Sequence, residues 1–300
     1  MSNITFNRPV GSYSLYDWLN GRVTLLTSTH AQLSNGAHNI DLYGVFTYDA
    51  TGITGGTITG LTFSQSGTPY LSFAAMSVTV GQFLQAPSDA AVLALFMRGN
   101  DTISGSANND ILYGYTGNDT FFGGAGVDTV LYDASKYGLT VTPSGSSYKV
   151  TTLGKTDTLN SIERIEAGNG SVLALDVKAG ENTGSAYRAY QAVFDRKPDI
   201  AGLNYWVKQM DNGMSLKDVA KGFVNSTEFK TLNPSTDTTA QINSYYQHVL
   251  HRTPDATGFQ YWANAANNGM QAHEMLAAFS ESAENIAAAA PALSGGIWLS

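Results

Sequence analysis

Four aspartates recur at intervals of nine residues, and this spacing constrains the fold more than any other feature of the chain. The four are Asp101, Asp110, Asp119 and Asp128. An apolar residue follows each of them two positions later, in the order Ile103, Leu112, Phe121 and Val130. Glycines precede the aspartates, as in residues 114–119 and 123–128. The pattern predicts a glycine-rich turn followed by a short strand in every nonapeptide, with the apolar side chain pointing inward.

Aspartates in register with glycine-rich turns are suited to holding a cation. Glycine adopts positive φ at little cost and lets carbonyl groups approach an ion closely. Calcium prefers about six to eight oxygen ligands at roughly 2.3–2.6 Å. We therefore predict calcium, held mostly by carbonyl oxygens, with the aspartates neutralising its charge. The alternative, four ordinary turns in a β domain, does not explain why the aspartates and the apolar residues keep one register.

Composition excludes several classes of function. The chain has 300 residues and no cysteine, so disulfides, thiol catalysis and cysteine zinc sites are ruled out. The net charge is −8 and no Lys/Arg cluster occurs, which argues against a nucleic-acid partner. No run approaches the ~18 apolar residues of a membrane span, so we expect no membrane insertion. Residues 1–9 lack the basic and apolar regions of a Sec-type signal peptide.

We expect a multidomain α+β protein with a β-rich N-terminal domain, a short parallel calcium β-roll and an all-α duplicated C-terminal domain. The expected bounds are 1–97, 98–180 for the roll with capping strands, 185–290, and a tail at 291–300. Alternating residues predict strands at 22–26, 40–46, 139–142 and 148–151. Turns are predicted at 52–56 and 65–69, and a helix at 90–97.

The C-terminal region contains one helical unit twice. Residues 190–199 match residues 246–255, and the match continues at a constant offset of 56 residues through Phe223 and Phe279. The sequence predicts helix N-caps at Asp199 and Asp255, left-handed C-terminal residues at Gly213 and Gly269, and a capping box of Ser215 with Asp218. The repeated Tyr-Trp pairs at 205–206 and 261–262 are expected on buried helix faces. Their functional alternative is a sugar-binding cleft.

The nonapeptides resemble the RTX family of type I-secreted proteins. In that family one coil takes two nonapeptides, so the resemblance implies that an ion lies between repeats two apart. It implies one site with Asp101, Asp119 and the carbonyls of Met97, Gly99, Gly114 and Thr116. It implies another with Asp110, Asp128 and the carbonyls of Ser106, Asn108, Gly123 and Ala125.

This sequence departs from the family pattern at both ends of the block. Phe96 and Met97 replace glycines of the first repeat, and Ser106 and Asn108 replace glycines of the second. Tyr137 stands at the next aspartate position, so nothing after Asp128 is expected to continue the register, and about two complete sites are expected, with partial ones as an alternative at the ends. Residues 157–165 and 173–176 resemble the usual ending of RTX blocks and are expected to form a structural cap.

The resemblance also implies export by the type I secretion machinery, with an uncleaved C-terminal signal, and an extracellular or cell-surface location. The helical repeat is similar to a domain of uncharacterised function found in RTX surface-layer proteins. No catalytic motif appears: His273-Glu274 lacks the second histidine of H-E-x-x-H, G-x-S-x-G is absent, and His248 and His251 lack a third metal ligand. We therefore do not expect an enzyme, although one with an unrecognised site is a third reading.

Two functions remain open at this point. The first is a secreted, S-layer-like structural protein that self-assembles with calcium into a surface layer, filament or matrix. The alternative is a monomeric adhesin that binds cell-surface polysaccharide through its helical module.

Overall fold

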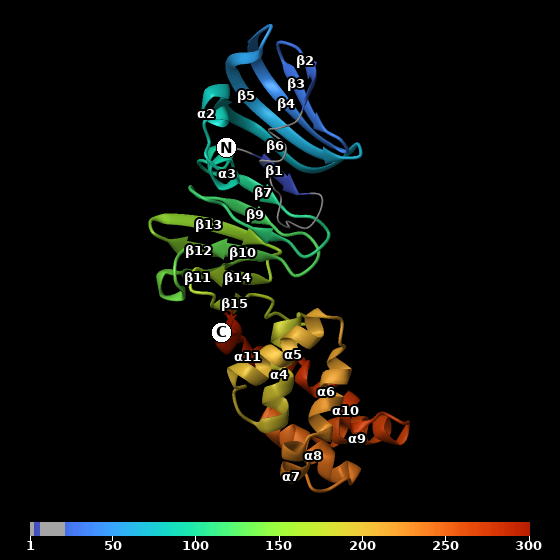
Figure 1. Cartoon of the computed structure of the whole chain (residues 1–300). Coiled ribbons are helices and arrows are strands. Elements are labelled where there is room, and N and C mark those ends of the chain that lie inside the picture. The colour runs from blue at the N-terminus through green and yellow to red at the C-terminus, as the bar shows by residue number, and fades with distance from the viewer. Residues whose placement is uncertain (1–2, 7–21) are drawn as a thin grey trace. The chain divides into compact units, whose positions relative to one another are not determined.

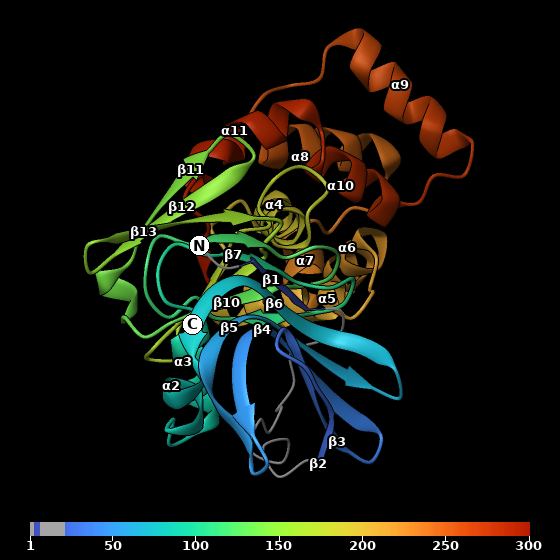
Figure 2. The same ribbon diagram turned by 90° about the horizontal axis from the view of Figure 1, so that it is seen from above.

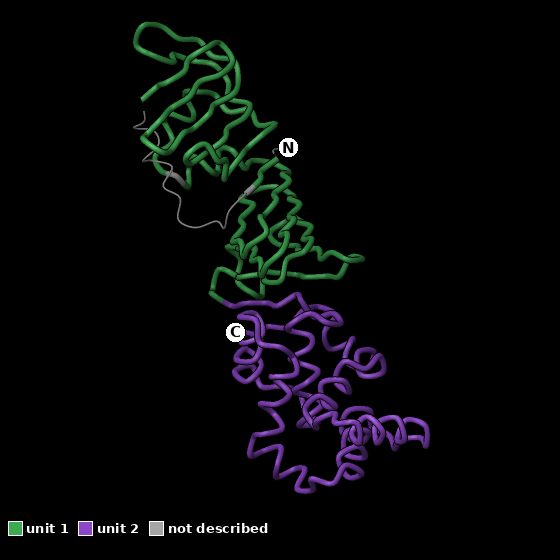
Figure 3. The backbone as a smooth tube through the Cα atoms, turned by 90° about the vertical axis from the view of Figure 1, so that its right-hand side faces the viewer, with its two compact units in different colours: residues 1–170 green, residues 171–300 purple. Residues whose placement is uncertain are grey.

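The computed structural model describes residues 3–6 and 22–300 and contains two compact units, residues 1–170 and 171–300 (Figures 1 and 3). The expectation about a signal peptide at residues 1–9 falls, apart from residues 3–6, outside the described part. Both strands and helices are present, and the helices that follow residue 180 form a C-terminal helical region, as expected.

The N-terminal strands form an antiparallel sheet. They are β1 (Asn3–Phe6), β2 (Arg22–Leu26), β3 (His30–Asn35), β4 (His38–Asp49), β5 (Gly52–Gln65) and β6 (Thr68–Thr79). The strands predicted at 22–26 and 40–46 are confirmed. The turn predicted at 65–69 is also confirmed, because Ser66 and Gly67 both have positive φ between β5 and β6.

The turn predicted at 52–56 is wrong, because these residues begin β5. The glycines there serve the pairing with β4, which is irregular between Thr47 and Tyr48. A Cβ on Gly56 would lie 2.0 Å from the carbonyl oxygen of Val45, so only glycine allows the two backbones to come this close. Glycines inside a strand often mark such irregular pairing or a close backbone approach.

Two short helices, α2 (Val80–Leu84) and α3 (Asp89–Phe96), precede the nonapeptides. The helix predicted at 90–97 is thereby confirmed. Phe96 packs against Phe73 and Phe83, with ring centroids 5.2 and 5.9 Å away. This packing explains why bulky residues replace glycines in the first repeat: that turn rests on the apolar core of the N-terminal sheet.

Each nonapeptide contributes one strand: β7 (Thr102–Ser104), β8 (Ile111–Leu112), β9 (Thr120–Phe122) and β10 (Thr129–Tyr132). β7 pairs with β9 and β8 with β10, both in parallel, so consecutive nonapeptides belong to different sheets. Ile103, Leu112, Phe121 and Val130 point inward and are at most 1% exposed. The predicted inward apolar positions are confirmed.

After β10 the chain leaves the stacked nonapeptide strands and later returns to them. It forms η1 (Lys136–Gly138), β11 (Thr140–Ser144) and β12 (Ser147–Thr152). β11 overlaps the strand predicted at 139–142, and β12 contains the strand predicted at 148–151. It returns as β13 (Lys155–Asn160), parallel to β9, and β14 (Arg164–Ala167), parallel to β10.

One sheet runs through the first unit, in the order β11-β12-β13-β9-β7-β1-β6-β5-β4-β3-β2 (Figure 1). β1 lies between β6 and β7 and pairs in parallel with β7, where Ile4 is opposite Ile103. The N-terminal strands therefore share a sheet with the nonapeptides.

In the second unit, the helices repeat with the offset of the sequence. The first copy has α4 (Asn182–Phe194), α5 (Ile200–Asp211), α6 (Leu216–Asn225) and α7 (Thr227–Leu232). The second has α8 (Thr238–Leu250), α9 (Ala256–Asn267), α10 (Ala272–Ser280) and α11 (Ala283–Leu293). α9 contains no buried residue and lies to one side of α8 and α10 (Figure 2). β15 (Val172–Ala174) pairs antiparallel with β16 (Ile297–Trp298).

Most of the predicted helix ends are confirmed. Asp199 and Asp255 accept the N–H groups of Gly202 and Gly258 at 2.7 and 2.8 Å, and Gly213 and Gly269 have positive φ. The capping box predicted at Ser215 is only half formed. The Ser215 hydroxyl accepts the backbone N–H of Asp218, but the Asp218 carboxylate accepts from that same hydroxyl and not from the Ser215 backbone.

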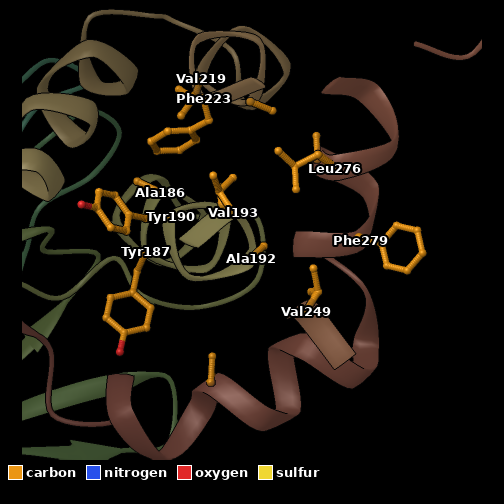
Figure 4. Packing of buried hydrophobic residues seen from close by; sticks show 14 of the residues in the cluster. Ala186, Tyr187, Tyr190, Ala192, Val193, Val219, Phe223, Val249, Leu276 and Phe279 are labelled. Atoms are coloured by element: carbon orange, nitrogen blue, oxygen red, sulfur yellow. The ribbon is translucent and has the colours of Figure 1, made fainter. Parts of the chain in front are cut away.

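The helical core joins the two copies. Tyr190 and Phe223 of the first copy lie on one side of α4, and Leu276, Phe279 and Val249 of the second lie on the other (Figure 4). The tryptophans of the two Tyr-Trp pairs are partly buried against this core. The prediction that the whole pairs are buried is wrong, because the Tyr205 and Tyr261 side chains are 55% and 63% exposed.

Candidate calcium site

The four repeated aspartates are buried and form two ladders. In the first ladder, the backbone N–H of Asp101 donates to Oδ1 of Asp119 at 2.9 Å. In the second ladder, the N–H of Asp110 donates to Oδ1 of Asp128 at 2.8 Å. All four residues are at most 2% exposed. The structure therefore brings together the aspartates that the family resemblance implied would share an ion.

In three of these carboxylates one oxygen faces no donor. Oδ1 of Asp110, Oδ2 of Asp119 and Oδ2 of Asp128 are buried and accept no hydrogen bond. A buried carboxylate oxygen without a donor is costly, because burial removes the water that would otherwise solvate it. Oxygens of this kind, set among turn carbonyls, fit calcium, which takes only oxygen ligands in proteins.

Burial also changes the acidity of the ladders. Desolvation raises the pKa of Asp119 to about 7 and the pKa of Asp128 to about 6, against opposing hydrogen bonds from the backbone. These carboxylates therefore take up a proton more readily than exposed aspartates when no cation is near.

The glycines let successive turns stack with carbonyls facing the next turn. A Cβ on Gly117, where φ is 115°, would lie 1.7 Å from the carbonyl oxygen of Gly99. A Cβ on Gly124 would lie 2.1 Å from the carbonyl oxygen of Ser106. The turns two repeats apart are thus in direct backbone contact.

The remaining candidate ligands lie in the same stacked turns. The N–H of Gly99 donates to the carbonyl of Thr116 at 3.2 Å. Cβ atoms on Gly114 and Gly123 would lie 2.3 and 2.4 Å from Oδ2 of Asp119 and Asp128. Met97 is buried at the end of α3, where its N–H donates to Leu93. Asn108 lies against Gly126, and the Ala125 side chain is exposed in its turn.

Two residues that the sequence analysis did not assign continue the ladders. The N–H of Asp119 donates to Oδ1 of Asp157 at 2.9 Å, and the N–H of Asp128 donates to Oε2 of Glu163 at 2.9 Å. The expectation that nothing after Asp128 continues the register is therefore wrong. A signal was present, because Leu159 and Ile165 follow these carboxylates by two positions, as in every nonapeptide.

Other candidate chemistry is weaker. Within residues 3–6 and 22–300, no group of three or more His, Asp or Glu side chains is arranged to hold a metal by itself. Any ion in the ladders would accordingly rely on backbone carbonyls. His248 and His251 have separate neighbours, Ser244 at 3.1 Å and Asp195 at 3.8 Å. Among the described helices, none has both the length and the apolar character needed to cross a membrane.

Known protein families match both the nonapeptides and the two helical copies. Residues 97–130 match the RTX calcium-binding nonapeptide repeat (4 copies), and residues 180–233 and 234–289 each match a domain of unknown function, DUF4214. No curated protein matches the chain. The solved structure of the extracellular lipase LipA from Serratia marcescens is 22% identical over 23% of this chain and 13% of that chain, with a TM-score of 0.14. RTX nonapeptide repeats bind calcium, so the matches support an RTX-type calcium-binding protein that also carries two copies of a domain of unknown function.

Proposed function

We propose that this chain is a secreted structural protein of the bacterial cell exterior that assembles with copies of itself when calcium is bound. The observation that carries the proposal is the pair of buried aspartate ladders with unsatisfied oxygens. Such a site favours folding of the coil only where calcium is available, which makes the ion a switch for assembly. The product would be a surface layer, a filament or matrix material.

In this proposal the nonapeptide region is a calcium β-roll. Asp101 and Asp119 hold one ion together with the carbonyls of Met97, Gly99, Gly114 and Thr116. Asp110 and Asp128 hold another with the carbonyls of Ser106, Asn108, Gly123 and Ala125. Bound calcium supplies the positive charge that the buried carboxylates lack.

The N-terminal sheet supplies an apolar surface for contact between copies. Tyr43 and Val45 of β4 are 44% and 66% exposed and point away from Ile40 and Leu42, which are buried. Leu25 of the edge strand β2 is 40% exposed. An exposed edge strand with apolar neighbours is a common site of strand-to-strand association.

Secretion fits the same mechanism. RTX repeat proteins are typically secreted. Low calcium inside the cell would leave the coil unfolded for the type I secretion machinery. Extracellular calcium, at about 10⁻⁴–10⁻³ M, would then fold it outside. The proposed role is not enzymatic.

Negative-stain electron microscopy of the purified chain tests the proposal. We expect ordered sheets or fibres with calcium, none with a chelator, and none for an Asp119→Asn/Asp128→Asn variant in calcium. Asp218→Asn, an exposed aspartate of α6, is the matched control and should assemble normally. Dispersed particles at high concentration in every condition would contradict assembly.

The exposed tyrosines favour a second function, a monomeric glycan-binding adhesin. Tyr205 meets Trp206 edge-on at 4.9 Å, and Tyr261 meets Trp262 edge-on at 5.0 Å, so each copy presents an aromatic pair. A polysaccharide ligand should change tryptophan fluorescence in the wild type. It should not do so in a Tyr205→Ala/Tyr261→Ala variant that remains folded.

A further inference from the structure

Lys155 is the first residue of β13 and follows a hairpin turn, Leu153-Gly154, that stacks on the nonapeptide turns. We call residues 96–101, 114–119 and 152–157 the first, second and third layers of the first ladder. Leu153 has φ 46° and Tyr115, 38 positions earlier, has φ 54°. The N–H of Thr156 donates to Oδ1 of Asn118 at 2.7 Å, just as the N–H of Asn118 donates to Oδ1 of Asn100 at 2.8 Å. The third layer therefore stacks on the second as the second stacks on the first.

The same offset places Lys155 at the position of Gly117 in the second layer and Gly99 in the first. The corresponding residues of the second ladder are Asn108 and Gly126. None of these four residues carries a positive charge. The third layer thus carries an ammonium group at a position that is otherwise glycine or asparagine, and its backbone also differs, because Thr152 and Lys155 pair across the hairpin of β12 and β13.

The ammonium group lies among atoms equivalent to the proposed calcium ligands. Nζ of Lys155 donates to the carbonyl oxygen of Tyr115 at 3.1 Å and lies 3.6 Å from Oδ2 of Asp157. Tyr115 holds the place in its turn that Met97 and Ser106 hold in theirs, 18 and nine residues earlier. The ammonium therefore contacts one carbonyl and one carboxylate of the set that would hold an ion one layer earlier.

The carboxylates of this layer favour a cation beside them. Asp119 is 1% exposed and Asp157 is fully buried, and the hydroxyl of Tyr132 lies beside the Asp157 carboxylate. Two buried negative charges in neighbouring layers repel each other unless a positive charge lies close to them. The ring of Tyr132 lies against the Lys155 ammonium group, with its centroid 5.7 Å from Nζ.

We infer that Lys155 is a built-in cation, taking the place of a calcium ion between Asp119 and Asp157 in the third layer. The inference rests on the proposed calcium roll. It means that the end of the first ladder is neutralised without calcium. It also means that removing the amine turns this layer into an additional divalent-cation site, with the carbonyls of Tyr115 and Gly117 beside the two aspartates.

Calcium titration of the full chain by calorimetry tests this inference. We expect Lys155→Gly to bind one calcium ion more than the wild type, and Lys155→Gly/Asp157→Asn to lose that extra ion. Lys149→Gly is the matched control, because Lys149 is exposed on the neighbouring strand β12, and its stoichiometry should equal that of the wild type. A folded Lys155→Gly variant with the wild-type number of ions overturns the inference.

A second measurement uses only the wild-type chain and does not depend on folding of a variant. Acetylation of lysines, followed by mass spectrometry, should modify Lys155 more slowly than Lys149 in saturating calcium, where the coil is folded. A Lys155 that becomes as reactive as Lys149 when calcium is added has been displaced by the ion, and this result also overturns the inference. A wild type that binds no calcium at all would instead refute the proposed roll.

Discussion

The backbone N–H of Asp119 donates to Oδ1 of Asp157 at 2.9 Å, although 38 residues separate the two. The contact repeats the one between Asp101 and Asp119, which are 18 residues apart. The difference of 20 residues is taken up by the excursion through η1, β11 and β12. The ladder is therefore longer in space than the run of nonapeptides is in the sequence.

Loss of a ladder carboxylate should weaken calcium binding. In Asp119→Asn the side chain no longer carries the negative charge that balances an ion, so we expect at least about a tenfold loss of calcium affinity, or about 1.4 kcal/mol. Calorimetric titration measures this loss. Asp218→Asn, on the exposed surface of α6, should titrate like the wild type.

Replacing Gly117, where two turns stack, should weaken calcium binding more than backbone strain alone would. In Gly117→Ala the new methyl group would overlap the carbonyl oxygen of Gly99 at 1.7 Å, so the first and second layers must move apart and calcium binding should be lost. Gly145→Ala isolates the strain, because φ is 65° there and no atom lies within 4 Å of the new Cβ. That control should lose about 1–2 kcal/mol of stability and keep its calcium affinity. Equal calcium binding by both variants would contradict the stacked turns.

Without calcium, the chain should be more stable in mild acid than in mild base. Asp119 and Asp128 have folded-state pKa values of about 7 and about 6, raised above the unfolded value by burial. A raised pKa stabilises the fold below the unfolded pKa of about 4, and this stabilisation is lost as pH rises through the folded pKa. We expect a loss of roughly 2–4 kcal/mol between pH 5 and pH 8, measured by urea denaturation of protein stripped of calcium on a chelating resin. Saturating calcium should reverse this trend, because the ion requires the ionised carboxylates.

The ion pair of a buried arginine, Arg188, should contribute strongly to the stability of the helical unit. Nε of Arg188, whose side chain is 1% exposed, donates to Oε1 of Glu281 at 2.7 Å and joins the first copy to the second. Glu281→Gln would leave the guanidinium without its counter-charge, so we expect a loss of about 3–5 kcal/mol in the free energy of unfolding. Glu228→Gln breaks an exposed pair with Arg196 and should cost less than about 1 kcal/mol. Similar losses in the two variants would contradict this account.

The sequence predicts the features that depend on strict periodicity. The inward apolar residues and the duplicated helices with their aspartate N-caps follow from constant spacing and residue type, whereas the pairing of aspartates two repeats apart was implied only by the resemblance to the RTX family. It does not predict the return of Asp157 and Glu163, because the hairpin between β10 and β13 breaks the spacing while backbone pairing restores the register. The expectation that both members of each Tyr-Trp pair are buried was also wrong. Neighbouring residues on a helix point in different directions, so Tyr205 is exposed while Trp206 is partly buried.

The most direct test is a crystal structure grown with calcium, with the ions located by anomalous scattering. The account predicts one peak between Asp101 and Asp119 and one between Asp110 and Asp128, with no peak at Nζ of Lys155. Crystals grown in saturating calcium that show no ion between either pair of aspartates would contradict it.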